Sequence, residues 1–533
     1  MHWADELLAQ GSQFVKGKSE VFVNAGLSVS GLQHVGRLRG EIVLSHIVAR
    51  ALREDGHRVQ QSLVLYTQDQ WEGTPQQIAE FADGSGGKYK SWRLIDVPDP
   101  FGCHAGWVDH YWEGFGNHLD DFAPEVQVVR TSDIYKRPEM KAIVEDLANR
   151  SEEVRTVFNK YRTRNPYPPG WIPFEPLCLQ CNRMGTARTI RVNDQSSVEY
   201  ECECGGRGAS PIERGKLQWR LEWTALWQVL KVTIEAFGKD HATPGGSRDS
   251  CKEFASVLFG FEAPFGIPYE WVAYAERGVD LGDMGSSDFK GFWPADWLAI
   301  GDAEVLRYIF LVNPLNRRIV LDLSKVDVYH DQYDAAERAF YASERTPDNE
   351  VLARSYELAQ LSFLPKAPTF QLSYRHAAFL HQISPEAKRL EWCLARLKDT
   401  GMLTRRLTDF EVDRIRRRIE QGALWVDRWS RENKVVLLQD LSNVIRSQLT
   451  AEDRESLRAY AERAESTEWR EDAIKESMVS LTKDGRLPVA TPRFFRNLYL
   501  VLLGKEDGPR AAPFLAVLDK KFVVSRLREA AKV

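Results

Sequence analysis

Four cysteines in the middle of the chain have a spacing that is typical of a metal site. They form a CxxC pair and a CxC pair: Cys178, Cys181, Cys202 and Cys204. Four thiolates suit tetrahedral Zn²⁺, and a shell of four protein ligands leaves no position open for a substrate. We therefore predict one structural zinc ion, with two unrelated cysteine pairs as the alternative. The other cysteines are isolated and are interpreted as core thiols: Cys103, Cys251 and Cys393.

A glycine- and serine-rich turn offers a second chemistry, the binding of phosphate. It runs from Ser30 to Arg37 and contains His34 and Gly36, between an apolar strand and a helix. A histidine there can donate to a phosphate oxygen, the glycine admits a nucleotide to the backbone, and the helix N-terminus adds N–H donors. A glycine turn with an incidental surface histidine explains the same residues.

The segment Gly238–His241 follows the apolar run Val232–Ile234 and should lie at the end of another strand. A carboxylate such as that of Asp240 can accept both hydroxyls of a ribose in this position. An ordinary turn after a strand is the alternative interpretation.

The elements that must position these residues are those of a parallel α/β fold. Apolar strands are expected at 21–24 and 59–66, joined by a helix with Leu44, Val48 and Leu52 on one face. Such a sheet binds ligands at the carboxyl ends of its strands. Residues 165–215 are interpreted as an insertion that carries the cysteine pairs, and roughly the last 180 residues as mostly helical.

Composition excludes several classes of protein. The 533 residues include 71 basic and 76 acidic side chains, a formal charge of −5, which excludes a uniformly basic nucleic-acid coat. Runs of apolar residues stay below the roughly 18 that a membrane span needs. We expect a cytoplasmic protein that binds neither DNA nor a membrane. Arg414, Arg417 and Arg418 share a helix face, which predicts either an RNA contact or a salt-bridged surface.

Taken together, the strings of this chain resemble the class I lysyl-tRNA synthetases nearly from end to end. The resemblance rests on the "HIGH"-type element Ser30–Gly36, on the cysteine knuckle and on these further segments: His2–Asp5, Val97–Cys103, Gly215–Trp223, Phe237–His241, Pro268–Trp271, Leu498–Tyr499, Gly504–Glu506 and Gly508–Arg510.

The resemblance implies a Rossmann-like catalytic domain over 1–295, a connecting domain over 296–350 and an all-α cage over 351–533 that binds the tRNA anticodon. It implies that the carboxylate of an amino acid, lysine by default, attacks the α-phosphate of ATP, with Mg²⁺ present. The acyl group then passes to tRNA. Such catalysis consists of positioning and charge stabilisation.

The resemblance also implies roles for individual residues. ATP would be bound by His34, Gly36, Gly238, Asp240, His241 and Met284. The catalytic residues would be His34 and Gly36 with three residues of a second signature, the counterpart of KMSKS: Ser286, Ser287 and Lys290. The amino-acid pocket would comprise Gly26, Ser28, Gly40, Glu41, Tyr66, Thr67, Trp107, Trp219, Arg248 and Tyr269.

The second signature departs from the family pattern. Asp283 stands where the family has its first lysine, and the second lysine is replaced by Asp288 or displaced to Lys290. An acid near a triphosphate repels it, and losing one preorganised charge-stabilising contact costs about 10²–10³ in rate. We therefore predict weakened activity.

The pocket departs as well. Gly40 replaces a glutamate, Glu41 should point about 100° away on the helix, and Asp69 is the one acid that remains after the second strand. Arg248 replaces a tyrosine and would repel an ammonium group. From these changes we predict that lysine binds poorly, that a neutral or acidic amino acid is less affected, and that Arg248 favours an acidic one. The alternative is that these positions point away from the pocket.

Three hypotheses follow from the sequence. The chain is a lysine–tRNA ligase, a paralogue that activates another amino acid for an acceptor other than tRNA, or a catalytically weak protein that binds tRNA or a nucleotide. Pyrophosphate exchange with each of the twenty amino acids separates them.

Overall fold

The computed structural model describes residues 2–344, 346–361, 363–483 and 487–532. The chain forms two compact units. The first comprises Met1–Leu298, Asp302–Asp322 and Ala336–Leu364, and the second comprises Ala299–Gly301, Leu323–Ala335 and Pro365–Val533.

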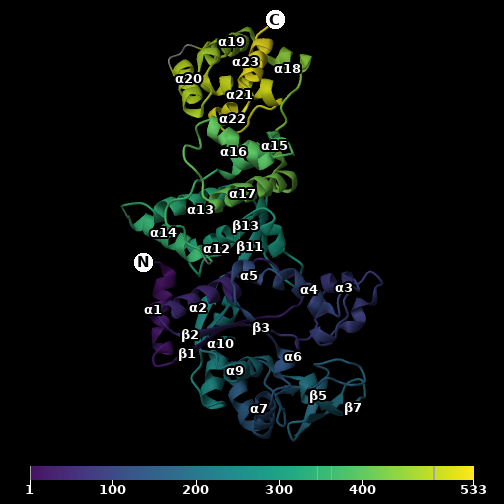
Figure 1. The fold of residues 1–533 in the computed structure, drawn as a ribbon. Helices are drawn as coiled ribbons and strands as arrows, with labels where there is room; N and C mark the ends of the chain where they lie inside the picture. Colours follow the sequence, from purple (N-terminus) through teal and green to yellow (C-terminus); the bar gives the residue numbers. More distant parts are fainter. Residues whose placement is uncertain (1, 345, 362, 484–486, 533) are drawn as a thin grey trace. The chain divides into compact units, whose positions relative to one another are not determined.

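A five-stranded parallel sheet forms the centre of the first unit, as the sequence predicts (Figure 1). Its strands, in spatial order, are β10 (Phe265–Tyr269), β9 (Ile234–Gly238), β1 (Glu20–Leu27), β2 (Arg58–Leu65) and β3 (Gln127–Arg130). Every pairing is parallel. Because β1 lies in the middle, its side chains are largely buried on both faces, which explains its apolar sequence. The carboxyl ends of β1, β2 and β9 lie at one edge of the sheet.

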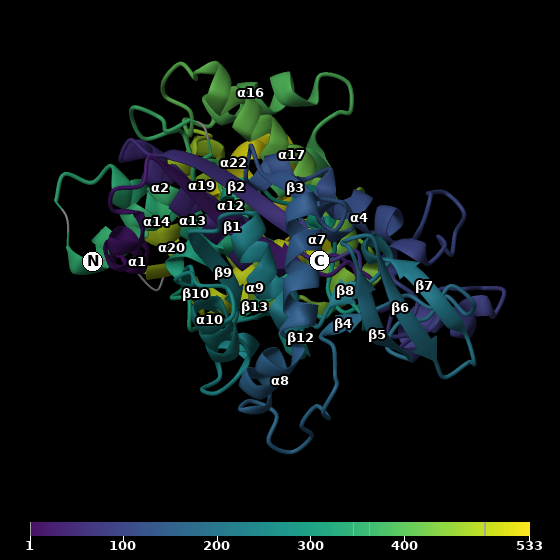
Figure 2. The same ribbon diagram turned by 90° about the horizontal axis from the view of Figure 1, so that it is seen from below.

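Smaller sheets surround this centre. The cysteine insertion forms the antiparallel ribbon of β5 (Ala187–Asn193), β6 (Ser197–Cys202) and β7 (Arg207–Pro211). Figure 2 shows this ribbon beside a second sheet, the pair β4 (Phe174–Glu175) and β8 (Lys216–Leu217). A third sheet holds β12 (Val279–Asp283), β11 (Val272–Glu276) and β13 (Ile319–Asp322). The helices of the first unit are α1 Trp3–Val15, α2 Ser45–Glu54, α3 Pro75–Ala79, α4 Trp107–Gly116, α5 Leu119–Phe122, α6 Thr131–Ile134, α7 Pro138–Asn149, α8 Ser151–Asn159, α9 Trp219–Val229, α10 Ser247–Val257, α11 Pro294–Leu298, α12 Ala303–Val312 and α14 Pro347–Ala359.

The helix after β1 begins with a π-helical segment, η1 (Leu38–Leu44), which continues as α2. π-helical turns are rare and often mark functional sites. Arg39 anchors this segment, since its buried guanidinium donates to the carbonyl oxygens of Glu270 at 2.6 Å, Arg317 at 2.8 Å and Pro314 at 2.8 Å. These bonds fix the start of the helix against the end of β10.

The second unit is helical, as predicted. Its helices are α15 Tyr374–Ile383, α16 Arg389–Asp399, α17 Asp409–Arg428, α18 Asn443–Gln448, α19 Ala451–Ser466, α20 Glu471–Lys483, α21 Thr491–Leu503, α22 Ala511–Val517 and α23 Lys520–Ala530. The helix α13 (Val326–Phe340) begins in this unit, and its last residues belong to the first. They enclose an apolar core that includes Phe494, Leu498 and Phe514. Within the described residues, no helix has the length and apolarity to cross a bilayer.

Two of the three arginines on the predicted face of α17 are not exposed on a surface. Arg414 and Arg418 are buried, and both pair with the Asp334 carboxylate, Arg414 at 2.8 Å. Charges taken out of water need such partners. The salt-bridge interpretation is therefore the correct one for these two residues.

Candidate active site

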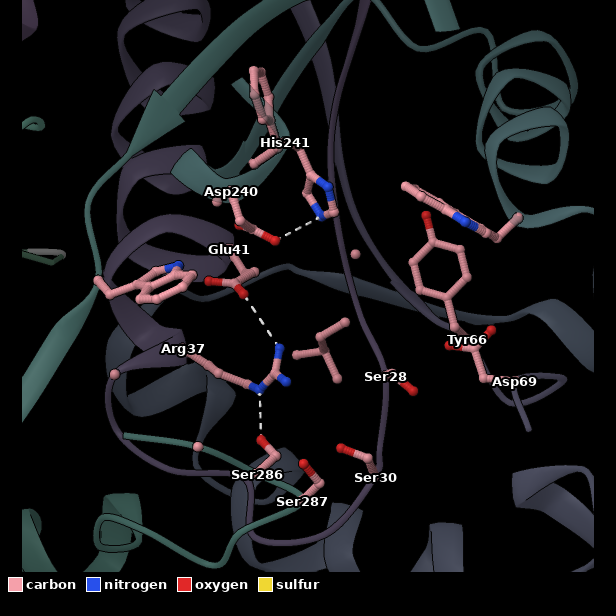
Figure 3. Close-up of a pocket in the computed structure, with 18 of the residues that line it drawn as sticks. Ser28, Ser30, Arg37, Glu41, Tyr66, Asp69, Asp240, His241, Ser286 and Ser287 are labelled. Carbon is pink, nitrogen blue, oxygen red and sulfur yellow. Dashed lines mark hydrogen bonds and ion pairs between the residues drawn. The ribbon is translucent and has the colours of Figure 1, made fainter. Parts of the chain in front are cut away.

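A cavity of about 930 Å³ lies at the carboxyl ends of β1, β2 and β9 (Figure 3). Its wall is strongly acidic. Among the described residues, its carboxylates are Glu41, Asp69, Glu72, Glu175, Glu222, Glu235, Asp240, Asp283 and Asp288, and its permanently charged cations are Arg37 and Lys216. The predicted residues on the wall are Gly26, Ser28, His34, Gly36, Glu41, Tyr66, Trp219, Gly238, Asp240, His241, Tyr269, Met284, Ser286 and Ser287.

His34 lies buried in the turn after β1, and its Nδ1 atom has no hydrogen-bond partner. Burial, followed by the positive charge of Arg37, holds the pKa of His34 well below its usual value. The ring is therefore neutral near pH 7 and can serve as an uncharged hydrogen-bond donor. Gly36 is required here, because a Cβ atom on it would lie 2.9 Å from His34 Nδ1.

The segment 282–291 packs directly on this turn. A Cβ atom on Gly31 would lie 2.4 Å from the carbonyl oxygen of Ser286, so glycine permits the close approach. Thr74 Oγ1 donates to the Ser287 carbonyl oxygen at 3.1 Å, and the amide of Val35 donates to the Phe292 carbonyl oxygen at 3.0 Å. The two signatures thus face one cavity.

The Gly238–His241 loop forms another wall. His241 Nε2 lies 3.4 Å from Asp240 Oδ2. The His241 ring lies beside two indoles, with its centroid 5.7 Å from that of Trp219 and 5.2 Å from that of Trp223. Flat rings beside a carboxylate suit a nucleoside, whose base stacks and whose ribose donates hydrogen bonds.

A buried cation cluster lies near the end of β2. Lys216 Nζ lies 2.5 Å from Asp69 Oδ1 and 2.7 Å from Glu222 Oε2, and its side chain is 5% exposed. The Tyr135 hydroxyl donates to the other oxygen of Glu222 at 2.9 Å. Burial raises the pKa of Glu222 to about 7, against the opposing effect of Lys216. One ammonium thus faces two carboxylates.

Glu41 points into the cavity, which corrects the expectation that it would turn away. It is 7% exposed, its Oε1 lies 3.5 Å from Arg37 Nη1, and its Oε2 has no hydrogen-bond partner among the described residues. Gly40 does not line the cavity, because the Tyr269 ring occupies the space in front of it: a Cβ on Gly40 would lie 2.1 Å from that ring. The π-helical segment therefore presents Glu41.

Arg248 is also placed differently from the prediction. It is absent from the cavity wall and buried, with Nη1 2.9 Å from Glu235 Oε2 and its guanidinium 4.3 Å from the centre of the Trp227 ring. Glu235, which the sequence analysis missed, accepts further bonds from Trp223 and Trp227. The charge of Arg248 is therefore neutralised within the fold, and it brings no cation to the cavity.

Three more predicted residues lie off the wall. Thr67 is fully buried and bonds to the Thr131 hydroxyl at 3.3 Å, while Trp107 is fully buried and donates to the Val29 carbonyl oxygen at 3.1 Å. Lys290 is exposed, because its backbone pairs with Gly285 to close the turn that carries the serines. All three support neighbouring walls through packing or backbone bonds.

The four cysteines of the insertion come together as predicted. All four sulfur atoms lie within 4.8 Å of one another, with Cys178–Cys204 at 3.6 Å and Cys181–Cys202 at 3.8 Å. Tetrahedral zinc at about 2.3 Å from each sulfur requires separations of about 3.8 Å. The donor set and its dimensions therefore fit Zn²⁺.

A second cluster was missed by the sequence analysis: Asp99, Cys103, His104 and His110. Cys103, interpreted from sequence as a core thiol, is exposed, and its sulfur lies 3.1 Å from His104 Nδ1 and 3.3 Å from His110 Nδ1. A tetrahedral zinc with sulfur and nitrogen ligands needs about 3.3–3.6 Å. His104 Nε2 also meets Glu113 at 2.7 Å, the outer contact common for metal-bound histidines. The spacing Asp-x₃-Cys-His-x₅-His was the available signal.

Two protein-family models match parts of this chain. A family model described as tRNA synthetases class I (K) matches residues 1–362, and one described as an anticodon binding domain matches residues 436–531.

Relatives match over the whole chain. A protein named lysine–tRNA ligase from Aeropyrum pernix is 41% identical, with 100% of this chain and 98% of that protein covered. Proteins of the same name from Methanosphaera stadtmanae and Pyrococcus furiosus are 30% and 29% identical, each with 99% of both chains covered. With a family model over the first 362 residues and a relative at 41% identity over full length, the chain belongs to the class I lysyl-tRNA synthetase family.

Proposed function

We propose that this protein is a lysine–tRNA ligase, which joins lysine to the AMP part of ATP with release of pyrophosphate and transfers the lysyl group to tRNA with release of AMP. The observation that carries the proposal is the acidic cavity beside the His34–Gly36 turn, in a chain that belongs to this family. Lysine and its adenylate are cationic, and a buried cation needs carboxylate partners.

We assign a separate role to each group of residues in the cavity. Asp240 and His241 bind adenosine, and neutral His34 donates to a phosphate oxygen of ATP. The lysine carboxylate attacks the α-phosphate, pyrophosphate leaves, and the adenylate then passes its acyl group to the terminal adenosine of tRNA. Holding the reactants in line and stabilising the charge on phosphorus accounts for such catalysis without a covalent enzyme intermediate.

Lysine carries two ammonium groups, and the cavity offers carboxylates on different elements to receive them. Glu41 comes from η1. Asp69 follows β2, and its Oδ1 also pairs with Lys216. Figure 3 draws the two acids on different sides of the pocket. These acids would supply the carboxylates that were expected to be missing because position 40 is a glycine. The predicted preference for an acidic amino acid loses its basis, because Arg248 is already paired with Glu235.

The prediction of weakened catalytic activity, which was based on Asp283, also changes. Asp283 does line the cavity, but Arg318 Nε pairs with it at 2.6 Å, which reduces its repulsion of a triphosphate. We therefore propose a working ligase. Mg²⁺ would accompany ATP, the four insertion cysteines would hold a structural Zn²⁺, and the helical second unit would bind the anticodon region of tRNA.

Lysine-dependent exchange of pyrophosphate into ATP tests the proposal. All twenty amino acids are compared, with ornithine added as a shorter analogue of lysine, and charging of tRNA is measured in parallel. We expect exchange with lysine and formation of lysyl-tRNA. Exchange with a different amino acid would support the paralogue, and no exchange with any would support the binding protein.

A further inference from the structure

The cavity has acids where a triphosphate needs cations. Asp283 and Asp288 line it on the loop 282–291, whereas Lys290 of that loop is exposed and lies off the wall. Of the two permanent cations on the wall, Lys216 is enclosed by Asp69 and Glu222. Arg37 is the other.

Arg37 is placed where the two signatures meet. It follows Gly36 at the start of η1, and its Nε donates to Ser286 Oγ at 3.0 Å (Figure 3). Its Nη1 lies 3.5 Å from Glu41, at the long end of hydrogen-bond range, and its side chain is 21% exposed. Across the described residues, its Nη2 makes no hydrogen bond, which leaves donors for a ligand.

The chemistry of a guanidinium fits this position. Arginine stays charged at any physiological pH and offers a planar fork of donors that matches the oxygens of a phosphate. Ser286 holds one edge of the Arg37 fork, so the remaining donors are oriented before a ligand arrives. A preorganised cation of this kind stabilises charge without reorganisation during the reaction.

We propose that Arg37 binds the β- and γ-phosphates of ATP and supplies the positive charge that the loop 282–291 lacks at positions 283 and 288. The inference rests on the proposed function for its choice of ATP as ligand. The competing explanation is that Arg37 serves to neutralise Glu41, its neighbour one helical turn away.

Calorimetric binding of ATP and AMP, without any amino acid, separates these explanations. In Arg37→Ala, we expect ATP to bind about tenfold to a hundredfold more weakly, as the loss of a charge-assisted contact predicts. AMP, which lacks the β- and γ-phosphates, should bind as it does to the parent protein. Arg37→Lys should restore part of the loss, because it keeps the charge but not the fork. Arg164→Ala, at an exposed residue off the cavity wall, is the matched control.

Two results would overturn the inference. One is an unchanged ATP affinity in Arg37→Ala with a weakened lysine affinity, which would leave Arg37 as the partner of Glu41. The other is a loss of ATP affinity in Lys290→Ala but not in Arg37→Ala. Circular dichroism and thermal unfolding check that each variant folds. If ATP binding depends on Arg37 but lysine drives no pyrophosphate exchange, the proposed function fails and the inference stands.

Discussion

Arg318 and Asp283 form an ion pair at 2.6 Å between the residue before β13 and the last residue of β12. Arg318 also pairs with Asp280, at 2.6 Å. Asp283, an acid on the cavity wall, is thus paired with a cation that comes from another part of the chain. Both side chains are about one-third exposed, so the pair is partly screened by solvent.

Removing Arg318 should expose the triphosphate to an unpaired Asp283. In Arg318→Ala we expect the KM for ATP to rise about twofold to fivefold, the range for a partly exposed pair. The double variant Asp283→Asn/Arg318→Ala should return toward the parent value. Steady-state pyrophosphate exchange at varied ATP measures both, and an Arg318→Ala variant with a lower KM would contradict the expectation.

Neutral isosteres test the proposed ammonium sites at Glu41 and Asp69. Glu41→Gln and Asp69→Asn should each raise the KM for lysine about tenfold to a hundredfold, because each removes a charge-assisted bond. Exchange kinetics at varied lysine give the values, with the exposed Glu54→Gln as the control. If neither variant changes the KM for lysine, the ammonium groups bind elsewhere.

Stability should fall in mild acid because of buried neutral histidines. Burial, followed by the charge of Arg307, lowers the pKa of His46 from 6.5 to about 2. Below pH 6.5 His46 binds a proton in the unfolded chain but not in the folded chain. Its contribution to the free energy of unfolding is therefore present above pH 6.5 and lost as the pH falls. Between pH 6.5 and 5 the loss approaches about 2 kcal/mol. Urea unfolding of His46→Asn should show a shallower pH slope than the parent, and an unchanged slope would contradict the expectation.

The metal content separates the two clusters. Purified protein should hold about two zinc ions per chain, one for each cluster of four ligands. Cys202→Ser should lose the zinc of the insertion and destabilise it, because metal binding is coupled to local folding. Cys103→Ser should lose the other ion and leave the insertion intact. Elemental analysis of the parent that finds one zinc would reject the second site.

The sequence was informative where a pattern is local. The apolar runs before Gly26 and Gly238 predicted strands of one parallel sheet, because a strand buried on both faces has few polar side chains. The cysteine pairs predicted their own cluster for a similar reason. Each depends on neighbours along the chain.

Features that depend on distant partners were not predictable. The charge of Arg248 is neutralised by Glu235. Glu235 is a buried acid inside β9, and a search for apolar runs does not single out such a residue. The direction of Glu41 depends on a π-helical start, whereas an α-helical rotation of 100° per residue turns it away. Cys103 looked isolated because its partners include a histidine seven residues later, brought back by the start of α4.

The side chain of Lys216 occupies a site that a free alkylamine could also fill. Its side chain places a primary amine between Asp69 and Glu222, as a bound alkylamine would be placed. Truncation in Lys216→Ala would leave two carboxylates facing a gap the size of that chain, so the variant should be impaired. Small amines such as methylamine or propylamine, added to the solution, should then rescue its activity in proportion to how well they fill the gap.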